Sequence, residues 1–433
     1  MIPQSSFMIL ATIDPKREAD LRRLLASMNR EPGLINPLNN LIPFGKMERL
    51  HYARIAILED QTIGDITAYG LPQIDFPKYL VFLGDVDGPA DRFLADLVGR
   101  ASDGLRLIFS HCDEYRPDVD LLSWINAKNV SSAANYVNWI GRTVVQIREE
   151  EALRQSLEKF IEENSASIRT MLPRQVHETL REFVTREQKA NRIRLTPSEP
   201  TPLGWQIQNF LHLIGIPVLL ILLLPLLLLY LPFFLIQLRL HERSDPEIAP
   251  RVDPAHANLL ASIEDHDVTN QFNALGRLKP GLFRLTTIMA VLAAIDYTAR
   301  HVFNHGRLAR VTTIHFARWV FLDGRKRVIF ASNYDGSLES YMDDFINKVS
   351  FGLNVVFSNG IAYPRTNWLL LDGAKDEQKF KDVLRRHQIP SQVWYNAFPG
   401  LTARDRHRNA LIRQGLEQAS MRDSELQTWL QLL

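Results

Sequence analysis

Histidine and arginine recur together at two distant places in the 433-residue chain. His51 and Arg54 lie in the segment LHYARIAIL, and His315 and Arg318 lie in the segment IHFARWVFL. Apolar residues fall on both faces of each segment, which predicts a central β-strand that is covered on both sides. A buried arginine needs an anion or a set of acceptors, and a buried histidine can act as an acid or a base. The pattern therefore suits either a catalytic site or ion pairs that stabilise a sheet.

An Asp-Gly pair follows each of these segments, at the end of the next expected strand. The two pairs are Asp87-Gly88 and Asp335-Gly336. Because the next strand should lie alongside, Asp87 and Asp335 are the expected partners of the buried arginines. Each pair is also typical of a turn that leads into a helix and caps its first residues. The presence of the same set in both places favours a structural role, since an asymmetric active site would normally lose the redundant copy.

These residues belong to a longer internal repeat that also covers the neighbouring elements. The matched segments are Leu50–Leu58 with Ile314–Leu322, Tyr79–Gly88 with Arg327–Gly336, and Phe93–Phe109 with Tyr341–Phe357. The first pair is offset by 264 residues and the other two by 248, so one insertion of 16 residues separates them. Collinear matches of this length predict a duplication.

Each copy predicts the element order β-α-β-β-α-β, the ferredoxin-like unit. The first copy should consist of a strand at Phe7–Ile13, a helix opened by Pro15, strands at Leu50–Leu58 and Tyr79–Leu83, a helix over Ala90–Arg100 and a fourth strand at Leu105–His111. The second should begin with a strand near Gln271–Leu278 and a helix over Leu282–Val302. The fold class is therefore α+β, with two ferredoxin-like repeats, a helical connector and a hydrophobic membrane segment.

The segment Leu213–Ile236 holds 24 residues without a charge. As a straight helix it would reach about 36 Å, enough to cross a hydrocarbon core of about 30 Å. It contains Pro217, Pro225 and Pro232, each of which can kink a helix. Soluble cores rarely need such an unbroken leucine run, so the segment is predicted to lie in the membrane.

Basic residues occur on both sides of this segment. They are Lys189, Arg192 and Arg194 before it, and Arg239, Arg243 and Arg251 after it. Basic flanks mark the cytoplasmic side, so a monotopic hairpin satisfies both flanks and a single crossing satisfies only one. The N-terminus lacks the pattern of a signal peptide. We therefore expect association with the inner, cytoplasmic membrane, with the soluble parts facing the cytoplasm; the sequence leaves hairpin and single span as alternatives.

Composition and length bound the remaining possibilities. The 50 basic and 49 acidic residues give a net charge of +1, which argues against a nucleic-acid binder. The single cysteine, Cys112, excludes an intrachain disulfide and multi-cysteine metal sites. The expected domains are a ferredoxin-like repeat (1–120), a helical connector with a proline-rich linker (121–204), the membrane segment (205–240), a second repeat (262–372) and a C-terminal α/β extension (373–433).

Two such repeats in one chain resemble the dimeric α+β barrel superfamily, which includes the dye-decolourising peroxidases. Gly84-Asp-Val-Asp87-Gly88 is similar to their GxxDG motif, and the second copy reads Ser332-Asn-Tyr-Asp335-Gly336. The resemblance implies haem as the cofactor, Asp87 as the acid that assists peroxide cleavage, and Arg54 or Arg318 as its distal partner. His315, or its counterpart His51, would then be the proximal ligand and Asp335 the second-copy acid. As a whole, the chain looks most like bacterial membrane-associated proteins.

Two classes of function follow from these observations. The first is a haem-dependent, peroxidase-like oxidoreductase that acts on membrane lipid or another apolar small molecule. The second is a non-catalytic membrane-associated scaffold or lipid-binding protein built from duplicated modules. The joint recurrence of buried His, Arg and Asp favours the enzyme slightly. A homo-oligomer is compatible with either class.

Overall fold

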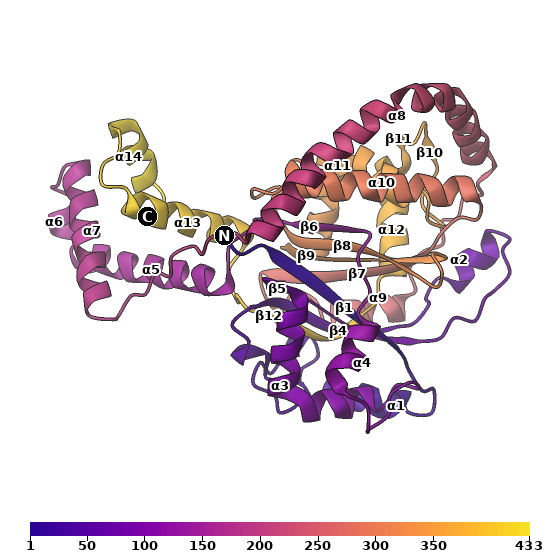
Figure 1. The fold of residues 1–433 in the computed structure, drawn as a ribbon, viewed down its shortest axis with the longest axis horizontal. Coiled ribbons are helices and arrows are strands. Elements are labelled where there is room, and N and C mark those ends of the chain that lie inside the picture. Colours follow the sequence, from indigo (N-terminus) through magenta and orange to yellow (C-terminus); the bar gives the residue numbers. More distant parts are fainter.

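The computed structural model describes residues 1–433, and two four-stranded antiparallel sheets form its centre (Figure 1). The strands of the first sheet, in spatial order, are β1 (Gln4–Thr12), β5 (Tyr79–Asp87), β4 (Leu50–Leu58) and β12 (Ser391–Asn396). The strands of the second sheet are β7 (Thr269–Arg277), β9 (Arg327–Asp335), β8 (Ile314–Leu322) and β6 (Ala134–Val137). The expected central strands are confirmed, since β4 and β8 each have a neighbour on both sides.

Each sheet receives its fourth strand from the other half of the chain. The strand β6 follows the first three strands of one sheet along the chain, yet it pairs with β8 of the other sheet. The strand β12 follows the second set and pairs with β4 of the first sheet. The expected fourth strand at Leu105–His111 is therefore wrong. Those residues are mostly helical because Leu97, Leu105 and Ile108 recur at helical spacing and are buried.

The inner faces of the two sheets pack against each other, and helices cover the two outer faces (Figure 1). The first outer face carries α1 (Glu18–Ala26), α3 (Ala90–Phe109) and α4 (Leu121–Lys128). The second carries α10 (Leu282–His301), α11 (Leu338–Phe357) and α12 (Glu377–His387). The result is four layers, of helices, sheet, sheet and helices.

The helices α3 and α11 have the same kink at matched positions. Ala101 in α3 has φ −137° and ψ 26°, and Val349 in α11 has φ −146° and ψ 31°. Val349 lies 248 residues after Ala101, which is the offset between the matched sequence segments. The correspondence of the two halves in sequence thus extends to an irregular feature of the backbone.

A helical arm extends from one end of the body (Figure 1). It consists of α5 (Val144–Glu163), α6 (Ser165–Ile168), α7 (Pro173–Lys189), α13 (Ala403–Glu417) and α14 (Asp423–Leu430). These helices share their own apolar cluster, which includes Leu153, Leu180 and Trp429. The arm thus combines helices from the connector at 121–204 and from the extension at 373–433, and each of these two segments also supplies one strand to the central sheets.

The apolar segment forms one continuous helix, α8 (Leu203–Ser244), of 42 residues. Figure 1 shows it as an arch that rises near one end of α10 and descends near the other. The turn of a two-helix hairpin is not formed, because each of the three prolines removes one backbone donor and bends the helix without ending it. By length and composition, α8 and α10 are both apolar enough to cross a membrane.

The remaining elements are short. They are β2 (Asn29–Glu31), β3 (Leu34–Ile35), α2 (Ile63–Ala68), α9 (Pro254–Ala261), β10 (Thr366–Asn367) and β11 (Leu371–Asp372). The strands β10 and β11 pair with each other, because the chain reverses between them at Trp368 and Leu369, which have positive φ.

Candidate functional site

The first His–Asp pair ties a sheet to a helix. His51 on β4 and Asp87 at the end of β5 are 2.8 Å apart, from Nε2 to Oδ1, and both side chains are buried. The other carboxylate oxygen of Asp87 accepts a hydrogen bond of 2.8 Å from the backbone N–H of Val144, the first residue of α5. A carboxylate at a helix N-terminus is stabilised by the free N–H groups there. Asp87 therefore anchors α5 rather than pairing with Arg54 as expected.

The second pair repeats this arrangement. His315 Nε2 lies 2.6 Å from Asp335 Oδ1, and Asp335 Oδ2 accepts from the backbone N–H of Ala403, the first residue of α13, at 2.7 Å. Arg406 adds a contact of 3.2 Å to His315 Nδ1 and one of 2.6 Å to the hydroxyl of Tyr52. Both nitrogens of His315 are thus occupied.

The charges around the second pair fix its protonation state. Burial lowers the pKa of His315, and the Asp335 carboxylate offsets this only in part. Burial raises the pKa of Asp335, but His315, the Ala403 amide and Arg406 together hold it below its ordinary value. His315 is therefore a neutral imidazole that donates a hydrogen bond to the ionised carboxylate of Asp335. Such a pair is a stable structural unit.

The histidines of the two pairs line one small cavity of about 40 Å³. This volume is close to the space that one or two water molecules occupy. A haem ligand would need a free ring nitrogen and an open space of several hundred Å³ beside it. The residues His51 and His315 therefore do not fit haem as the structure holds them, because Nε2 of each ring is bound to a carboxylate.

The two arginines cross from one sheet to the other. Arg54 Nη1 donates to the carbonyl of Phe272 at 3.0 Å and to Asn273 Oδ1 at 2.9 Å, and its Nη2 donates to the carbonyl of Ser332 at 3.0 Å. All three acceptors belong to the second sheet. The side chain also stacks over the ring of Trp394.

Arg318 makes the reciprocal crossing. Its guanidinium donates to the carbonyls of Phe7 at 2.8 Å and Gly84 at 3.2 Å, and it forms an ion pair with Asp85. Asn333 occupies the position that matches Asp85 and donates to the same carboxylate at 3.2 Å. The arginines thus link the two inner faces of the sheets, with Asp85 as the only carboxylate that contacts either of them.

Burial opposes the charge of both arginines. It lowers the pKa of Arg54 to about 9, although Asp85 raises it in part, so the side chain keeps its charge at pH 7. Burial also lowers the pKa of Arg318, again opposed by Asp85. The Nη donors of both arginines bond to backbone and side-chain oxygens of the opposite sheet. Of the predicted site residues, the structure therefore brings the two histidines together at one small cavity, each bound to its aspartate, and places the arginines deeper between the sheets.

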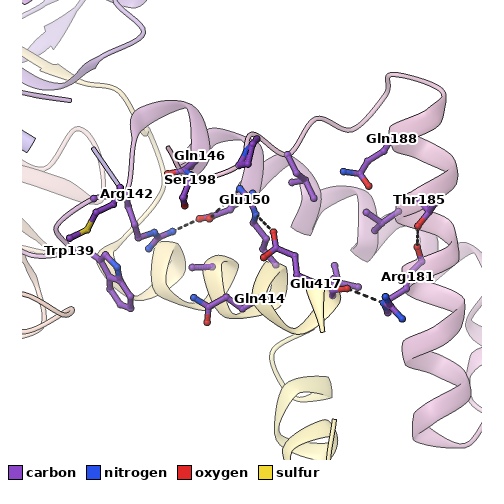
Figure 2. Close-up of a pocket in the computed structure, with 18 of the residues that line it drawn as sticks. Trp139, Arg142, Gln146, Glu150, Arg181, Thr185, Gln188, Ser198, Gln414 and Glu417 are labelled. Carbon is purple, nitrogen blue, oxygen red and sulfur yellow. Dashed lines mark hydrogen bonds and ion pairs between the residues drawn. The ribbon is translucent and has the colours of Figure 1, made fainter. Parts of the chain in front are cut away.

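A larger polar cleft of about 670 Å³ lies among the arm helices α5, α7 and α13, beside the loop that carries Trp139 and Arg142 (Figure 2). Its arginines are paired within the protein. Arg142 forms an ion pair with Glu150, and Arg413 Nε donates to Glu417 at 2.8 Å. Arg181 donates to the carbonyl of Leu416 at 3.0 Å. The basic groups of the cleft are therefore engaged within the protein, where they help to hold α5, α7 and α13 together.

An apolar cavity of about 330 Å³ lies under α10 and α11, on the outer face of the second sheet. Of its 22 lining residues 20 are hydrophobic, and no histidine, lysine or arginine is among them. Sequence reasoning missed this cavity because its lining comes from three helices, a loop and three strands. Its volume lies within the range of small-molecule sites, about 300–1,000 Å³.

Both ends of α8 are bound to the body. At the first end Tyr297 of α10 donates to the carbonyl of Leu213, and Arg300 donates to Asn209. At the other end, Phe234 and Phe283 have ring centroids 5.4 Å apart.

Two buried carboxylates fix the second end, and sequence reasoning did not single them out. Glu242 accepts hydrogen bonds from the backbone N–H groups of Trp368 and Leu369, at 3.0 and 2.7 Å. Asp245 accepts from Lys279 at 2.7 Å and also bonds to Arg284. The sequence signal that could have found them is a pair of acidic residues among the basic residues that follow the apolar segment.

Comparison with known proteins adds no relationship. The chain matches no protein-family model, and neither the curated proteins nor the solved structures show significant similarity to it.

Proposed function

We propose that the protein is a monotopic membrane protein that binds lipid without catalysing a reaction, with the arch of α8 inserted in one leaflet. The body would then lie on the cytoplasmic side, as the basic flanks of the segment favour. The observation that carries this proposal is the attachment of both ends of α8 to the same body.

The lengths of α8 and α10 explain why the attached helix must bow outward. Between Leu213 and Phe234 the helix α8 runs about 32 Å, whereas between Phe283 and Tyr297 the helix α10 runs about 21 Å. The excess of about 10 Å lifts the proline-containing part of α8 away from the body, and its leucines there are exposed. A straight crossing would place the two attachments on opposite sides of a core of about 30 Å.

The geometry of the buried polar residues supports a non-catalytic role. Asp87 and Asp335 hold helix N-termini, and Arg54 and Arg318 link the two sheets. Each of these four side chains therefore makes structural contacts that explain why it is buried. The largest apolar cavity supports lipid binding, because its lining suits a hydrocarbon chain.

We also infer that the two halves arose from one duplicated ferredoxin-like module that exchanges its last strand with its partner module. The matched His–Asp pairs, the reciprocal arginines and the shared kink support this origin. The relation to the dimeric α+β barrel superfamily stays a proposal on the same grounds.

Cysteine labelling tests the topology. Ser167 precedes α8, Ser244 ends it, and both are exposed. The native Cys112 gives a low background, because it is buried and burial raises the pKa of its thiol to about 12. In inverted inner-membrane vesicles, Ser167→Cys and Ser244→Cys should both react with a membrane-impermeant maleimide, and in intact spheroplasts neither should react. Reaction of only one of the two in inverted vesicles would contradict a monotopic arrangement.

A visible spectrum tests the haem-dependent alternative. Nε2 of both His51 and His315 is bound to a carboxylate, and the cavity beside the two rings is small. We therefore expect the purified protein, supplemented with haemin, to show no Soret band that depends on His315. The control is the His305→Ala variant, since His305 is exposed and forms no ion pair with either aspartate. A Soret band that is lost in His315→Ala and kept in His305→Ala would restore the peroxidase hypothesis.

A further inference from the structure

The surroundings of one matched glycine differ between the two halves, and the apolar cavity lies where they differ. In the first half, a Cβ added to Gly104 of α3 would clash with the backbone of Leu41, so the loop that carries Leu41 packs closely on that helix. In the second half, a Cβ at the matched Gly352 of α11 would meet open space. Gly352 lines the 330 Å³ cavity.

The reason lies in the connecting segments. Residues 27–49 join α1 to β4 in the first half, and the shorter segment 302–313 joins α10 to β8 in the second. The longer segment supplies Ile42, Phe44 and Met47 to the first core. The shorter one places Phe303, Leu308 and Ala309 only along the cavity wall. The space that the first half fills with its own chain is therefore left open in the second.

The ring of Trp319 lines this cavity, and its one polar group has no partner in the protein. The side chain of Trp319 is 5 % exposed, and its Nε1–H has no hydrogen-bond acceptor in the protein. The same ring also lines a smaller apolar cavity of about 70 Å³ next to the first. An unpaired buried donor is costly, and an acceptor oxygen on a bound molecule would satisfy it.

The lining restricts the charge of that molecule. Because no basic side chain lines the cavity, a carboxylate there would be buried without a counter-charge. A neutral carbonyl, as in an ester, meets the single N–H without this penalty. The volume limits the size of the ligand. A cavity of about 150 Å³ holds benzene, which has six carbon atoms, so a cavity of about 330 Å³ has room for about a dozen carbon atoms.

The cavity lies next to the foot of the α8 arch. On α10, Thr298 lines the cavity while its neighbour Tyr297 donates to the carbonyl of Leu213, where the apolar run of α8 begins. Phe351 lines the cavity as well, although 57 % of its surface is exposed, which places it at the mouth.

We propose that this cavity binds a neutral single-chain lipid, taken from the membrane, whose apolar chain of about twelve carbons fills the space and whose ester carbonyl accepts a hydrogen bond from Trp319. The inference rests on the proposed membrane attachment for the source of the lipid. To the proposed function it adds a binding site, a class of ligand and the residue, Trp319, that recognises the ligand.

Photolabelling tests the site in the full-length protein. The probe is monododecanoylglycerol with a diazirine near the end of its chain, incorporated into phosphatidylcholine vesicles that carry the protein. After irradiation, peptide mass spectrometry should find adducts both on α8 and on the cavity-facing residues of α11, such as Met342 and Phe345. Adducts on α8 report membrane insertion, and adducts on α11 report the cavity.

Gly352→Leu provides the decisive variant, because its side chain has room to fill the cavity. It should reduce the α11 adducts at least tenfold, leave the α8 adducts unchanged and raise the melting temperature. Gly99→Leu is the matched control, since Gly99 is a helical glycine on the exposed face of α3 where a Cβ also meets open space. It should leave both sets of adducts unchanged.

Two further comparisons test the proposed recognition. Trp319→Phe keeps an aromatic ring but removes the donor, so the concentration for half-maximal α11 labelling should rise about fivefold. The diazirine analogue of dodecanoic acid, ionised at pH 8, should label α11 at least tenfold less than the ester. Absence of α11 adducts, or α11 adducts that persist in Gly352→Leu, would overturn the cavity site. Absence of α8 adducts alone would overturn the membrane attachment and leave the cavity site standing.

Discussion

Replacing Leu222 and Leu229 together with lysine should release the protein from lipid vesicles. These side chains are 71 % and 79 % exposed on the α8 arch, and they contact little else in the protein. A lysine costs about 2.5–3.5 kcal/mol at the centre of a bilayer. Even if the shallower arch incurs only about 1 kcal/mol for each, the total of about 2 kcal/mol lowers partitioning roughly thirtyfold.

Flotation with phosphatidylcholine vesicles measures this effect. Neutral lipid is required, because anionic lipid would attract the added lysines and mask the loss. The matched control carries lysine at Leu38 and Leu172, two exposed leucines outside α8. The control should float like the unmodified protein. If the α8 variant floated equally well, the arch would not be the membrane anchor.

Replacing Arg318 with leucine should destabilise the body by about 3–5 kcal/mol. The change removes the ion pair with Asp85 and leaves that carboxylate buried, with Asn333 as its remaining side-chain donor. Loss of one partner of a buried pair typically has this cost, because the other charge stays in a medium of low dielectric constant. At about 2 °C per kcal/mol for a chain of this size, the melting temperature should fall by roughly 6–10 °C.

A double-mutant cycle identifies the cause. Leucine at both Arg318 and Asp85 removes the unpaired charge, so the double variant should be more stable than Arg318→Leu alone. Arg310→Leu is the control for loss of an exposed arginine and should change the melting temperature by less than about 1 °C. If Arg318→Leu behaved like this control, the cross-link between the sheets would contribute little to stability.

Local pattern was sufficient for most of the elements that carry the buried polar residues. The alternation of LHYARIAIL and IHFARWVFL predicts two central strands, and both are present as β4 and β8. The partners of their polar residues could not be read in the same way. Asp87 was expected beside Arg54, but a β-bulge near Leu50 and Tyr52 and the arrival of α5 bring Asp87 to His51 and Val144 instead.

The sequence by itself determined the α+β class, the correspondence of the two halves and the 24-residue apolar run, because each depends on residues close together in the chain or on direct comparison of two segments. Only the tertiary structure decided which sheet receives β6 and β12, where both ends of α8 attach, and that Gly352 borders a cavity while Gly104 does not. Those outcomes depend on contacts between residues far apart in the chain. Their energy comes from burial and hydrogen bonding that no local periodicity encodes.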